Sequence, residues 1–196
     1  IAKFALGYSP ETWDAFTKEA LGKGYKLEFL ESTGLTIPKE DRPFDRFKGR
    51  VMFPIQSMSG RILGFGGRIL TNDKKAAKYL NSPETPVFHK GRELYGLFEA
   101  RESIHSAGYV LVTEGYMDVV ALAQWGFPNA VATLGTACTP DHVQKLFRFT
   151  DSVVFSFDGD NAGRRAARKA LDGALGYATD VRSIKFLFLP QEHDPD

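Results

Sequence analysis

Hydrophobic and polar positions follow two different rhythms along the 196-residue chain. Up to Lys90, short amphipathic patterns typical of helices alternate with apolar runs typical of strands. Ser9 followed by Pro10 supplies an N-cap and a proline at the first helical position, which predicts a helix from about Pro10 to Leu21. The stretch YKLEFLESTGL predicts a second helix that ends near Gly34. The apolar runs VMFPI and RILGFGGRIL, joined by the turn SMSG, predict a glycine-rich antiparallel region.

From Gly91 onward, strand and helix patterns alternate. They run in the order YVLVTE, GYMDVVALAQWG, AVATLG, TPDHVQKLF, SVVFSFDGD, NAGRRAARKAL and VRSIKFLFLP. Thr139, Pro140 and Asp141 open the middle helix as N-cap, first helical residue and first-turn acid. We therefore predict an α+β chain, in which a mixed N-terminal part with antiparallel strands is followed by a mostly parallel sheet with helices on both faces.

Composition narrows the class of protein. With 43% hydrophobic and 25% charged residues, the chain is expected to be globular. Its 25 basic and 24 acidic residues leave a net charge of +1, so a nucleic acid would have to bind to a local patch. The single cysteine excludes an internal disulfide and a cysteine-rich zinc site in this chain, and it suits a reducing cytoplasm. No apolar run is long enough for a membrane span, and the missing initiator Met leads us to expect a fragment.

Carboxylates recur where the predicted strands of the second half end. They are Glu114 with Asp118, Asp158 with Asp160, and Asp194 with Asp196. Strand ends of this kind expose side chains to ligands, and clustered carboxylates repel one another unless cations neutralise them. An all-oxygen ligand set suits Mg²⁺ or Mn²⁺, as in phosphoryl or nucleotidyl transfer. Helix N-terminal acids or turn formation explain any one pair as well, but three pairs in consecutive units favour the metal site.

Basic and aromatic side chains are mixed in the region before these acids. The basic residues are Arg50, Arg61, Arg68, Lys74, Lys75, Lys78, Lys90 and Arg92, and the aromatic residues are Phe53, Phe65, Tyr79 and Phe88. Such a mixture is typical of a groove that binds single-stranded nucleic acid, although a solvated surface is the simpler explanation for any one of these residues. The GFGG stretch at 64–67 would let the backbone approach a ligand, or it marks a bulge.

The remaining distinctive side chains carry weaker signals. We expect Trp13 and Trp125 in the core, Cys138 as a small buried residue, and His89 as a packing or orienting residue. Three arginines follow the DGD motif on one predicted helix, and solvation and DNA contact explain them equally well. They are Arg164, Arg165 and Arg168.

The ordered motifs EGYMD, DGD and DPD resemble the Toprim fold of bacterial primases, topoisomerases and some nucleases. The stretches RVMFPI, GFGGR, KYLNSPET, FHKGRELYGL and EGYMDVVAL resemble the catalytic core of bacterial DnaG-type DNA primases over nearly the whole chain. The resemblance implies a nucleotidyltransferase that makes short RNA primers from ribonucleoside triphosphates on a single-stranded DNA template. It also implies a basic subdomain at 1–90 and a Toprim catalytic subdomain at 91–196.

The resemblance implies roles for individual residues. Glu114, Asp158 and Asp160 would take part in catalysis, and these three with Asp118, Asp194 and Asp196 would hold Mg²⁺ or Mn²⁺. Glu114 could instead act as an acid or base. The proposed nucleotide or template contacts are Arg68, Lys78, Asn81 and Lys90.

Family resemblance also implies partners beyond this chain. Family members carry a zinc-binding domain and a helicase-interaction domain, so the replicative helicase is an expected partner of the full-length protein, and a triphosphate site is compatible with regulatory nucleotides. A topoisomerase or nuclease with the same acids is one alternative, although nothing in the sequence marks Tyr25, Tyr79 or Tyr95 as a nucleophile. The other alternative is an inert nucleotide-binding module, against which the intact set of acids argues.

Overall fold

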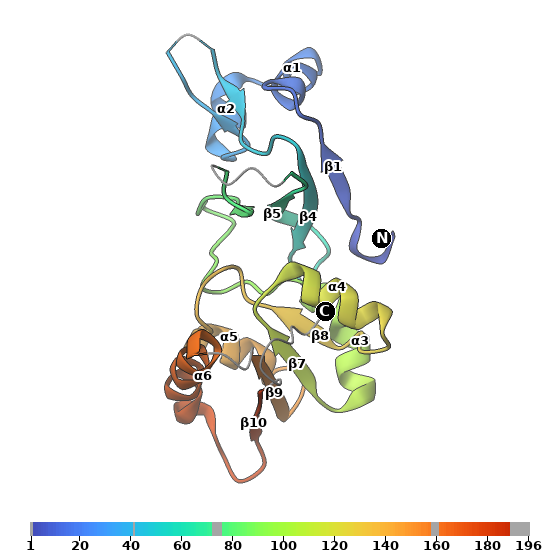
Figure 1. The fold of residues 1–196 in the computed structure, drawn as a ribbon, viewed down its shortest axis with the longest axis vertical. Helices are drawn as coiled ribbons and strands as arrows, with labels where there is room; N and C mark the ends of the chain where they lie inside the picture. Colours follow the sequence, from blue (N-terminus) through green and yellow to red (C-terminus); the bar gives the residue numbers. More distant parts are fainter. Residues whose placement is uncertain (1, 41, 72–75, 158–160, 189–196) are drawn as a thin grey trace. The chain divides into compact units, whose positions relative to one another are not determined.

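The computed structural model describes residues 2–40, 42–71, 76–157 and 161–188 (Figure 1). The chain divides into two compact units. Unit 1 comprises Ile1–Pro54 and Leu63–Phe88, and unit 2 comprises Ile55–Ile62 and His89–Asp196. The functional division expected after residue 90 stays a prediction.

The larger sheet of the first half has four strands in the order β1-β4-β5-β6. Its strands are β1 (Gly7–Ser9), β4 (Arg50–Gln56), β5 (Ile62–Ile69) and β6 (Tyr79–Asn81). β1 pairs antiparallel with β4, and β6 pairs antiparallel with β5. Between β4 and β5 the chain turns at the predicted SMSG sequence, where the N–H of Gly60 donates to the carbonyl of Ser57 at 2.9 Å. The predicted antiparallel region is confirmed.

The first predicted helix begins later than expected. After the short helix η1 (Ala2–Phe4), Ser9 belongs to strand β1, where it pairs with Arg50, and α1 spans Ala15–Gly22. The Pro10 start is therefore wrong, because the strand pairing and a hydrogen bond from the Ser9 hydroxyl to the Phe47 carbonyl draw this segment onto the sheet. The second helix, α2 (Leu27–Ser32), lies within its predicted stretch.

A buried carboxylate from a small hairpin caps α1. The hairpin strands are β2 (Thr36–Ile37) and β3 (Phe44–Asp45), which pair antiparallel. The Asp45 side chain accepts hydrogen bonds from the N–H groups of Phe16 and Thr17, at 2.7 and 3.0 Å, and from the Thr17 hydroxyl at 2.7 Å. The first turn of a helix has N–H groups without helical partners, so Asp45 satisfies two of them across the chain.

The four strands of the unit 2 sheet pair in parallel in the order β10-β9-β7-β8, and Tyr95 adds an isolated antiparallel bridge to Ala132. Its strands are β7 (Val110–Thr113), β8 (Ala130–Ala132), β9 (Ser152–Phe157) and β10 (Ser183–Phe188). The helices are α3 (Leu97–Ala107), α4 (Tyr116–Gln124), α5 (Pro140–Leu146), α6 (Asn161–Ala174) and the short η2 (Leu175–Tyr177). The predicted alternation of strand and helix is confirmed, with α3 as a helix that the pattern did not reveal.

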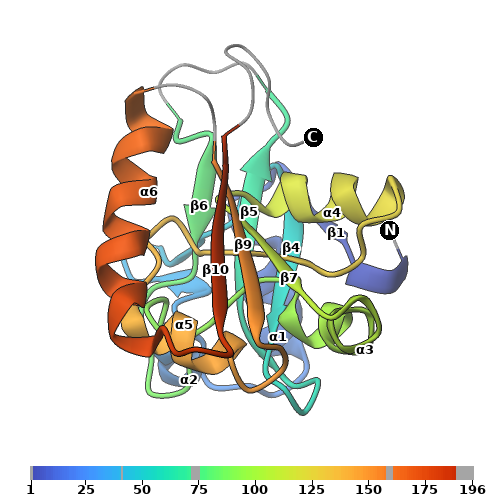
Figure 2. The same ribbon diagram turned by 90° about the horizontal axis from the view of Figure 1, so that it is seen from below.

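Helices cover both faces of this parallel sheet. α3 and α4 lie on one side, with α6 on the other (Figures 1 and 2). The core between these layers is built mainly from aliphatic and phenylalanine side chains, among them Ile104, Val110, Val131, Leu146 and Phe155. This burial is the main source of stability for the α/β arrangement.

Both tryptophans contradict the sequence-based expectation. Trp13 is 59% exposed and Trp125 is 76% exposed, so neither belongs to the core. Trp125 is the C-cap residue of α4, and Trp13 packs edge-on against Phe44. Cys138 is partly buried against the core of unit 2, in line with its predicted role. Among the described residues, no helix has the length and apolar character needed to cross a membrane.

Candidate functional site

Glu114 lies at the carboxyl edge of the parallel sheet, directly after β7. It lines a cavity of about 350 Å³ together with Thr113, Thr133, Arg165 and Lys169. The Glu114 side chain is exposed, whereas both threonines are buried. The cavity therefore combines a carboxylate, hydroxyl groups and two cationic side chains, a set suited to a phosphorylated ligand with a metal ion.

Asp118 has a structural contact of its own. One oxygen of its carboxylate accepts a hydrogen bond from the N–H of Gly115, the N-cap residue of α4, at 3.0 Å. This is the helix-capping role that the sequence left open for the acids of this segment. The expected metal role of Asp118 stays a prediction.

The other predicted carboxylates lie outside the described residues. They are Asp158, Asp160, Asp194 and Asp196. The strands that precede them in the sequence are β9, which ends at Phe157, and β10, which ends at Phe188, and these two residues pair in the parallel register. Within the ranges that the structure covers, no three His, Cys, Asp or Glu side chains form a metal-binding group.

Three of the four predicted nucleotide contacts lie on neighbouring strands of unit 1 or directly beside them. Arg68 on β5 pairs with Tyr79 on β6, and Asn81 on β6 pairs with Gly66 on β5. Lys78 directly precedes Tyr79 in the sequence. Lys78 is exposed, and its ammonium group lies 5.8 Å from the centre of the Tyr79 ring. The buried Nε of Arg68 has no hydrogen-bond partner among the residues that can be described. Asn81 and Lys78 therefore lie on or beside the edge strand β6, and Arg68 lies on the inner strand β5 next to it.

Several residues of the predicted groove belong to the core instead. Phe53 and Phe88 are fully buried, so they cannot stack on bases. Arg50 is also buried, and its guanidinium donates to the carbonyls of Gly67 and Lys78 at 3.3 and 3.4 Å. Burial lowers the pKa of Arg50, but an arginine stays charged at neutral pH. Arg50 therefore joins β4 to the neighbouring strands.

The glycines of GFGG make room for side chains rather than for a ligand. A Cβ on Gly67 would lie 2.7 Å from the Phe47 ring, and a Cβ on Gly64 would lie 3.1 Å from the Cβ of Ser82. These approaches are closer than ordinary side-chain packing allows. At these two positions, the expected approach to a ligand is replaced by close packing inside unit 1.

An aromatic and basic groove of unit 1 escaped the sequence-based prediction. Lys48 lies 3.8 Å from the centre of the Trp13 ring, and Trp13 packs edge-on against Phe44 at 5.9 Å between ring centres. These residues and Arg46 line a cavity of about 590 Å³. An exposed ring beside cations is the arrangement that stacks and tracks single-stranded nucleic acid. The signal in the sequence was the polar surroundings of Trp13, next to Asp14.

The arginines of α6 divide between surface and cavity. Arg168 forms an ion pair with Asp172 at 3.3 Å, and the Arg164 guanidinium lies 5.4 Å from the centre of the Phe188 ring. Arg165 instead lines the cavity beside Glu114, as does Lys169, which the sequence analysis did not single out. Of the three arginines, only Arg165 is placed for contact with a ligand in this cavity.

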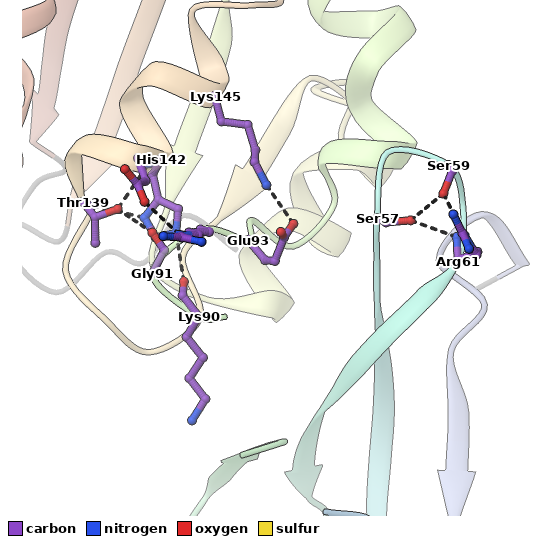
Figure 3. Close-up of polar contacts among 11 residues, drawn as sticks. Ser57, Ser59, Arg61, Lys90, Gly91, Glu93, Thr139, His142 and Lys145 are labelled. Carbon is purple, nitrogen blue, oxygen red and sulfur yellow. Dashed lines mark hydrogen bonds and ion pairs between the residues drawn. The ribbon is translucent and has the colours of Figure 1, made fainter. Parts of the chain in front are cut away.

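Lys90, the fourth predicted contact, belongs to unit 2. Its segment is held against α5 by hydrogen bonds from Thr139 and His142 and by an ion pair between Glu93 and Lys145 (Figure 3). His142 is fully buried, whereas His89, the histidine expected to pack or orient, is exposed. The buried histidine was missed because its burial depends on the distant segment at 89–93.

Three nucleophilic side chains of unit 2, those of Cys138, Tyr95 and Tyr116, are held protonated by burial. Burial raises the pKa of the Cys138 thiol to about 12, which leaves no thiolate at neutral pH. Burial also raises the pKa of the Tyr95 and Tyr116 hydroxyls well above their ordinary value, with further contributions at Tyr95 from Glu99 and Tyr116. Protonated, buried groups of this kind are poor nucleophiles, so none of these three is suited to attack a phosphodiester.

Two family models match the chain in succession. The model described as DNA primase catalytic core, N-terminal domain, matches residues 1–101, and the Toprim domain matches residues 108–185. A DNA primase of Neisseria meningitidis serogroup A is 53% identical over 196 residues, covering 100% of this chain and 32% of that protein. A DNA primase of Escherichia coli K12 is 52% identical, covering 100% of this chain and 34% of the relative. The chain thus spans about a third of the length of these curated relatives.

Solved structures agree with the fold. The E. coli primase catalytic core superposes with a TM-score of 0.93 at 52% identity, covering 100% of this chain and 62% of that one. A DnaG primase catalytic domain bound to single-stranded DNA superposes with a TM-score of 0.92 at 52% identity, covering 100% of this chain and 63% of that one. The chain belongs to the family of bacterial DnaG-type DNA primases, within whose catalytic core it comprises the N-terminal domain and the Toprim domain.

Proposed function

We propose that this chain carries out template-directed synthesis of short RNA primers on single-stranded DNA in the bacterial cytoplasm. The observation that carries the proposal is the acid-bearing edge of a parallel sheet at Glu114 in a chain that matches the primase catalytic-core model and then the Toprim model. The substrates would be ribonucleoside triphosphates, and the product would be an RNA primer paired with the template. The replicative helicase would be a partner of the full-length protein, through a part outside this chain.

The donor atoms beside Glu114 fit a hard divalent cation. A carboxylate flanked by hydroxyl groups offers the oxygen ligands that Mg²⁺ and Mn²⁺ prefer. We propose that Glu114, Asp118, Asp158, Asp160, Asp194 and Asp196 supply these ligands. Such an ion, when bound, polarises hydroxyl and phosphate oxygens as a Lewis acid.

Nucleotidyl transfer joins the 3′-hydroxyl oxygen of the primer to the α-phosphate of the incoming nucleotide and releases pyrophosphate. Glu114 could take the proton of that hydroxyl if it does not hold the cation. Arg165 and Lys169, which line the same cavity, would neutralise negative charge on the phosphates. Lys90 and Arg68 would bind phosphate groups of the triphosphate or of the template.

Template binding is proposed for unit 1. A related catalytic domain has been solved bound to single-stranded DNA. In this chain, the cavity lined by Trp13 and Lys48 combines a stacking surface with positive charge. Lys78 and Asn81, on or beside β6, would add a phosphate contact and a hydrogen bond to a sugar or phosphate.

A triphosphate site also admits regulatory nucleotides. Guanosine tetraphosphate would compete with the ribonucleoside triphosphates for the same cationic side chains, because both carry clustered phosphates. Competition would appear as a rise in the KM for ribonucleotides with an unchanged maximal rate.

The identity of the reaction product tests the proposed function. The purified protein is incubated with single-stranded DNA, radiolabelled ribonucleotides and Mg²⁺ or Mn²⁺, beside an Asp158→Asn variant. We expect short, template-dependent RNA that the variant does not make. Metal-dependent cleavage of the DNA without RNA synthesis would instead support the nuclease alternative. The absence of both RNA and cleaved DNA would support an inert binding module.

A further inference from the structure

Four contacts attach the segment around Lys90 to the first turns of α5. The Thr139 hydroxyl donates to the Gly91 carbonyl at 2.6 Å, and His142 contacts the Lys90 carbonyl through Nε2 at 2.9 Å. Arg92 pairs with Asp141 at 3.1 Å, and Lys145 pairs with Glu93 at 2.9 Å. Of these contacts, the His142 hydrogen bond is the one made to Lys90 itself.

The contacts of its two nitrogens fix the state of the His142 ring. Nδ1 lies 3.1 Å from the backbone nitrogen of Thr139, which can only donate, so Nδ1 must be the unprotonated acceptor. Nε2 then carries the proton and donates it to the Lys90 carbonyl. The ring is fully buried, so water cannot replace either partner. His142 is therefore a rigid connection between the N-cap of α5 and the main chain of Lys90.

We propose that neutral His142 is a positioning residue that fixes the main chain of Lys90 and so presents the Lys90 ammonium group to the phosphates of the incoming nucleotide. In Figure 3, the Lys90 side chain extends away from α5, while its carbonyl is held by the ring. A four-carbon side chain is flexible, so fixing its Cα restricts where the ammonium group can reach. The inference rests on the nucleotide contact proposed for Lys90.

The surroundings of His142 preserve its neutral form. Burial lowers its pKa, and the nearby Lys145 lowers it further, while the hydrogen bonds to the backbone of Lys90 and Glu93 and the charge of Glu93 act in the opposite direction. Arg92 and Asp141 face each other across the same junction as an exposed ion pair. An imidazolium would place a second N–H against the N–H of Thr139, so protonation would break this connection.

A double-mutant cycle between His142 and Lys90 separates positioning from general stability. In His142→Gln, the amide can still cap α5 at the N3 position, but it lacks the rigid second contact. We expect the KM for ribonucleotides to rise about fivefold, the effect of losing one hydrogen bond, with little change in kcat. Lys90→Met should raise the KM at least about tenfold, because it removes a charged phosphate contact. The double variant should match Lys90→Met alone.

Val143→Ala is the matched control. Val143 lies next to His142 on α5 and is buried in the core, where its contacts involve hydrophobic side chains. The control lowers the melting temperature, but we expect it to leave the KM unchanged. If it raises the KM as much as His142→Gln does, His142 acts through general stability and the inference fails.

The other outcomes are equally distinct. An unchanged KM in His142→Gln with a raised KM in Lys90→Met overturns the inference and leaves the proposed function of Lys90 intact. Additive effects in the double variant also overturn it, since His142 would then act elsewhere. An unchanged KM in Lys90→Met removes the nucleotide contact itself, and the inference falls with it.

One measurement needs no variant. Nitrogen-15 NMR of the histidine side chains in the intact protein distinguishes protonated from unprotonated ring nitrogens. We expect His142 at neutral pH to show an unprotonated Nδ1 and a protonated Nε2. The opposite tautomer, or a charged ring, would overturn the proposed connection.

Discussion

His142 is expected to make the stability of the protein sensitive to acid. Its pKa in the fold is lower than the ordinary value of 6.5, so the unfolded chain binds a proton at a pH where the folded protein does not. Protons therefore favour the unfolded state as the pH falls below that value. The contribution of neutral His142 to the stability of the folded protein is fully present above pH 6.5. It is lost progressively as the pH falls toward the lowered pKa of the folded state.

Urea unfolding at about pH 7.5 and about pH 5.5 measures this effect. We expect the free energy of unfolding to fall between the two conditions, and to fall less in His142→Gln. His105→Gln, a substitution at an exposed histidine, is the control. An identical pH dependence in the wild type and in His142→Gln would contradict the expected role of burial.

At the scale of single residues, sequence predicts chemical type better than burial. Glu114 is placed correctly after its strand, because strand and helix patterns around it are strong. Trp13 is exposed and Phe53 is buried, the reverse of their expected roles in core and groove. Such assignments depend on which distant segment covers a side chain, which a local pattern does not contain.

At the scale of elements, Asp45 connects a strand to a helix that is distant in sequence. Its carboxylate accepts three hydrogen bonds from Phe16 and Thr17, and Asp45 is only 5% exposed. A buried acceptor of this kind stabilises the helix N-terminus, and its loss leaves buried donors unsatisfied.

Replacement of Asp45 therefore tests the capping of α1. We expect Asp45→Ala to lower the free energy of unfolding by about 2–3 kcal/mol, and Asp45→Asn to lower it less, because one oxygen remains as an acceptor. Denaturant titration gives both values. Asp180 is exposed, so Asp180→Ala should change the stability by less than about 0.5 kcal/mol. An equal effect of both alanine variants would argue against the cap.

The groove of unit 1 makes a separate prediction about template binding. Loss of one stacked base costs about 1–3 kcal/mol, so Trp13→Ala should weaken binding of single-stranded DNA by roughly fivefold to a hundredfold. Lys48→Met should reduce the salt dependence of binding by about 0.7 in the logarithmic slope, as expected for one phosphate contact. Fluorescence anisotropy over a range of salt concentrations measures both.

Trp125 provides the matched control for this groove. It is exposed like Trp13 but lies at the end of α4 in unit 2. Trp125→Ala should bind single-stranded DNA with the affinity of the wild type. If both tryptophan variants weaken binding equally, or if neither does, the groove beside Lys48 is not the template site.

Elements with a regular pattern of apolar residues were predictable from the sequence. Element ends that depend on the pairing of distant strands were not. The alternation from β7 to β10 follows from apolar runs that need two covered faces. The start of α1 was wrong because a good capping sequence at Ser9 competes with strand pairing to β4, and the pairing wins. α3 was missed because only Leu97, Ala100 and Ile104 of its 11 residues are buried, although these three positions follow helical spacing.

At the scale of the whole molecule, the two units divide the chemistry. Unit 2 contributes the carboxylate edge and the cavity with Glu114, Arg165 and Lys169, and unit 1 contributes an aromatic and basic groove. The order of acids along the sequence was enough to predict a metal-dependent enzyme. The contribution of Arg165 and Lys169 on α6 to this cavity was not predictable. Spacing along the helix alone does not separate Arg165 from Arg164 or Arg168.

The most direct test of the account is the rate of primer synthesis as a function of Mg²⁺ concentration in the wild type, Glu114→Gln and Asp158→Asn. We predict a rate that rises and saturates with Mg²⁺ in the wild type, and that is lower by about a hundredfold or more in both variants. Circular dichroism should show an unchanged fold in both, and Asp180→Asn should keep the wild-type rate. A variant at either acid that keeps both the wild-type rate and its Mg²⁺ dependence would contradict the metal-binding role proposed for this edge of the sheet.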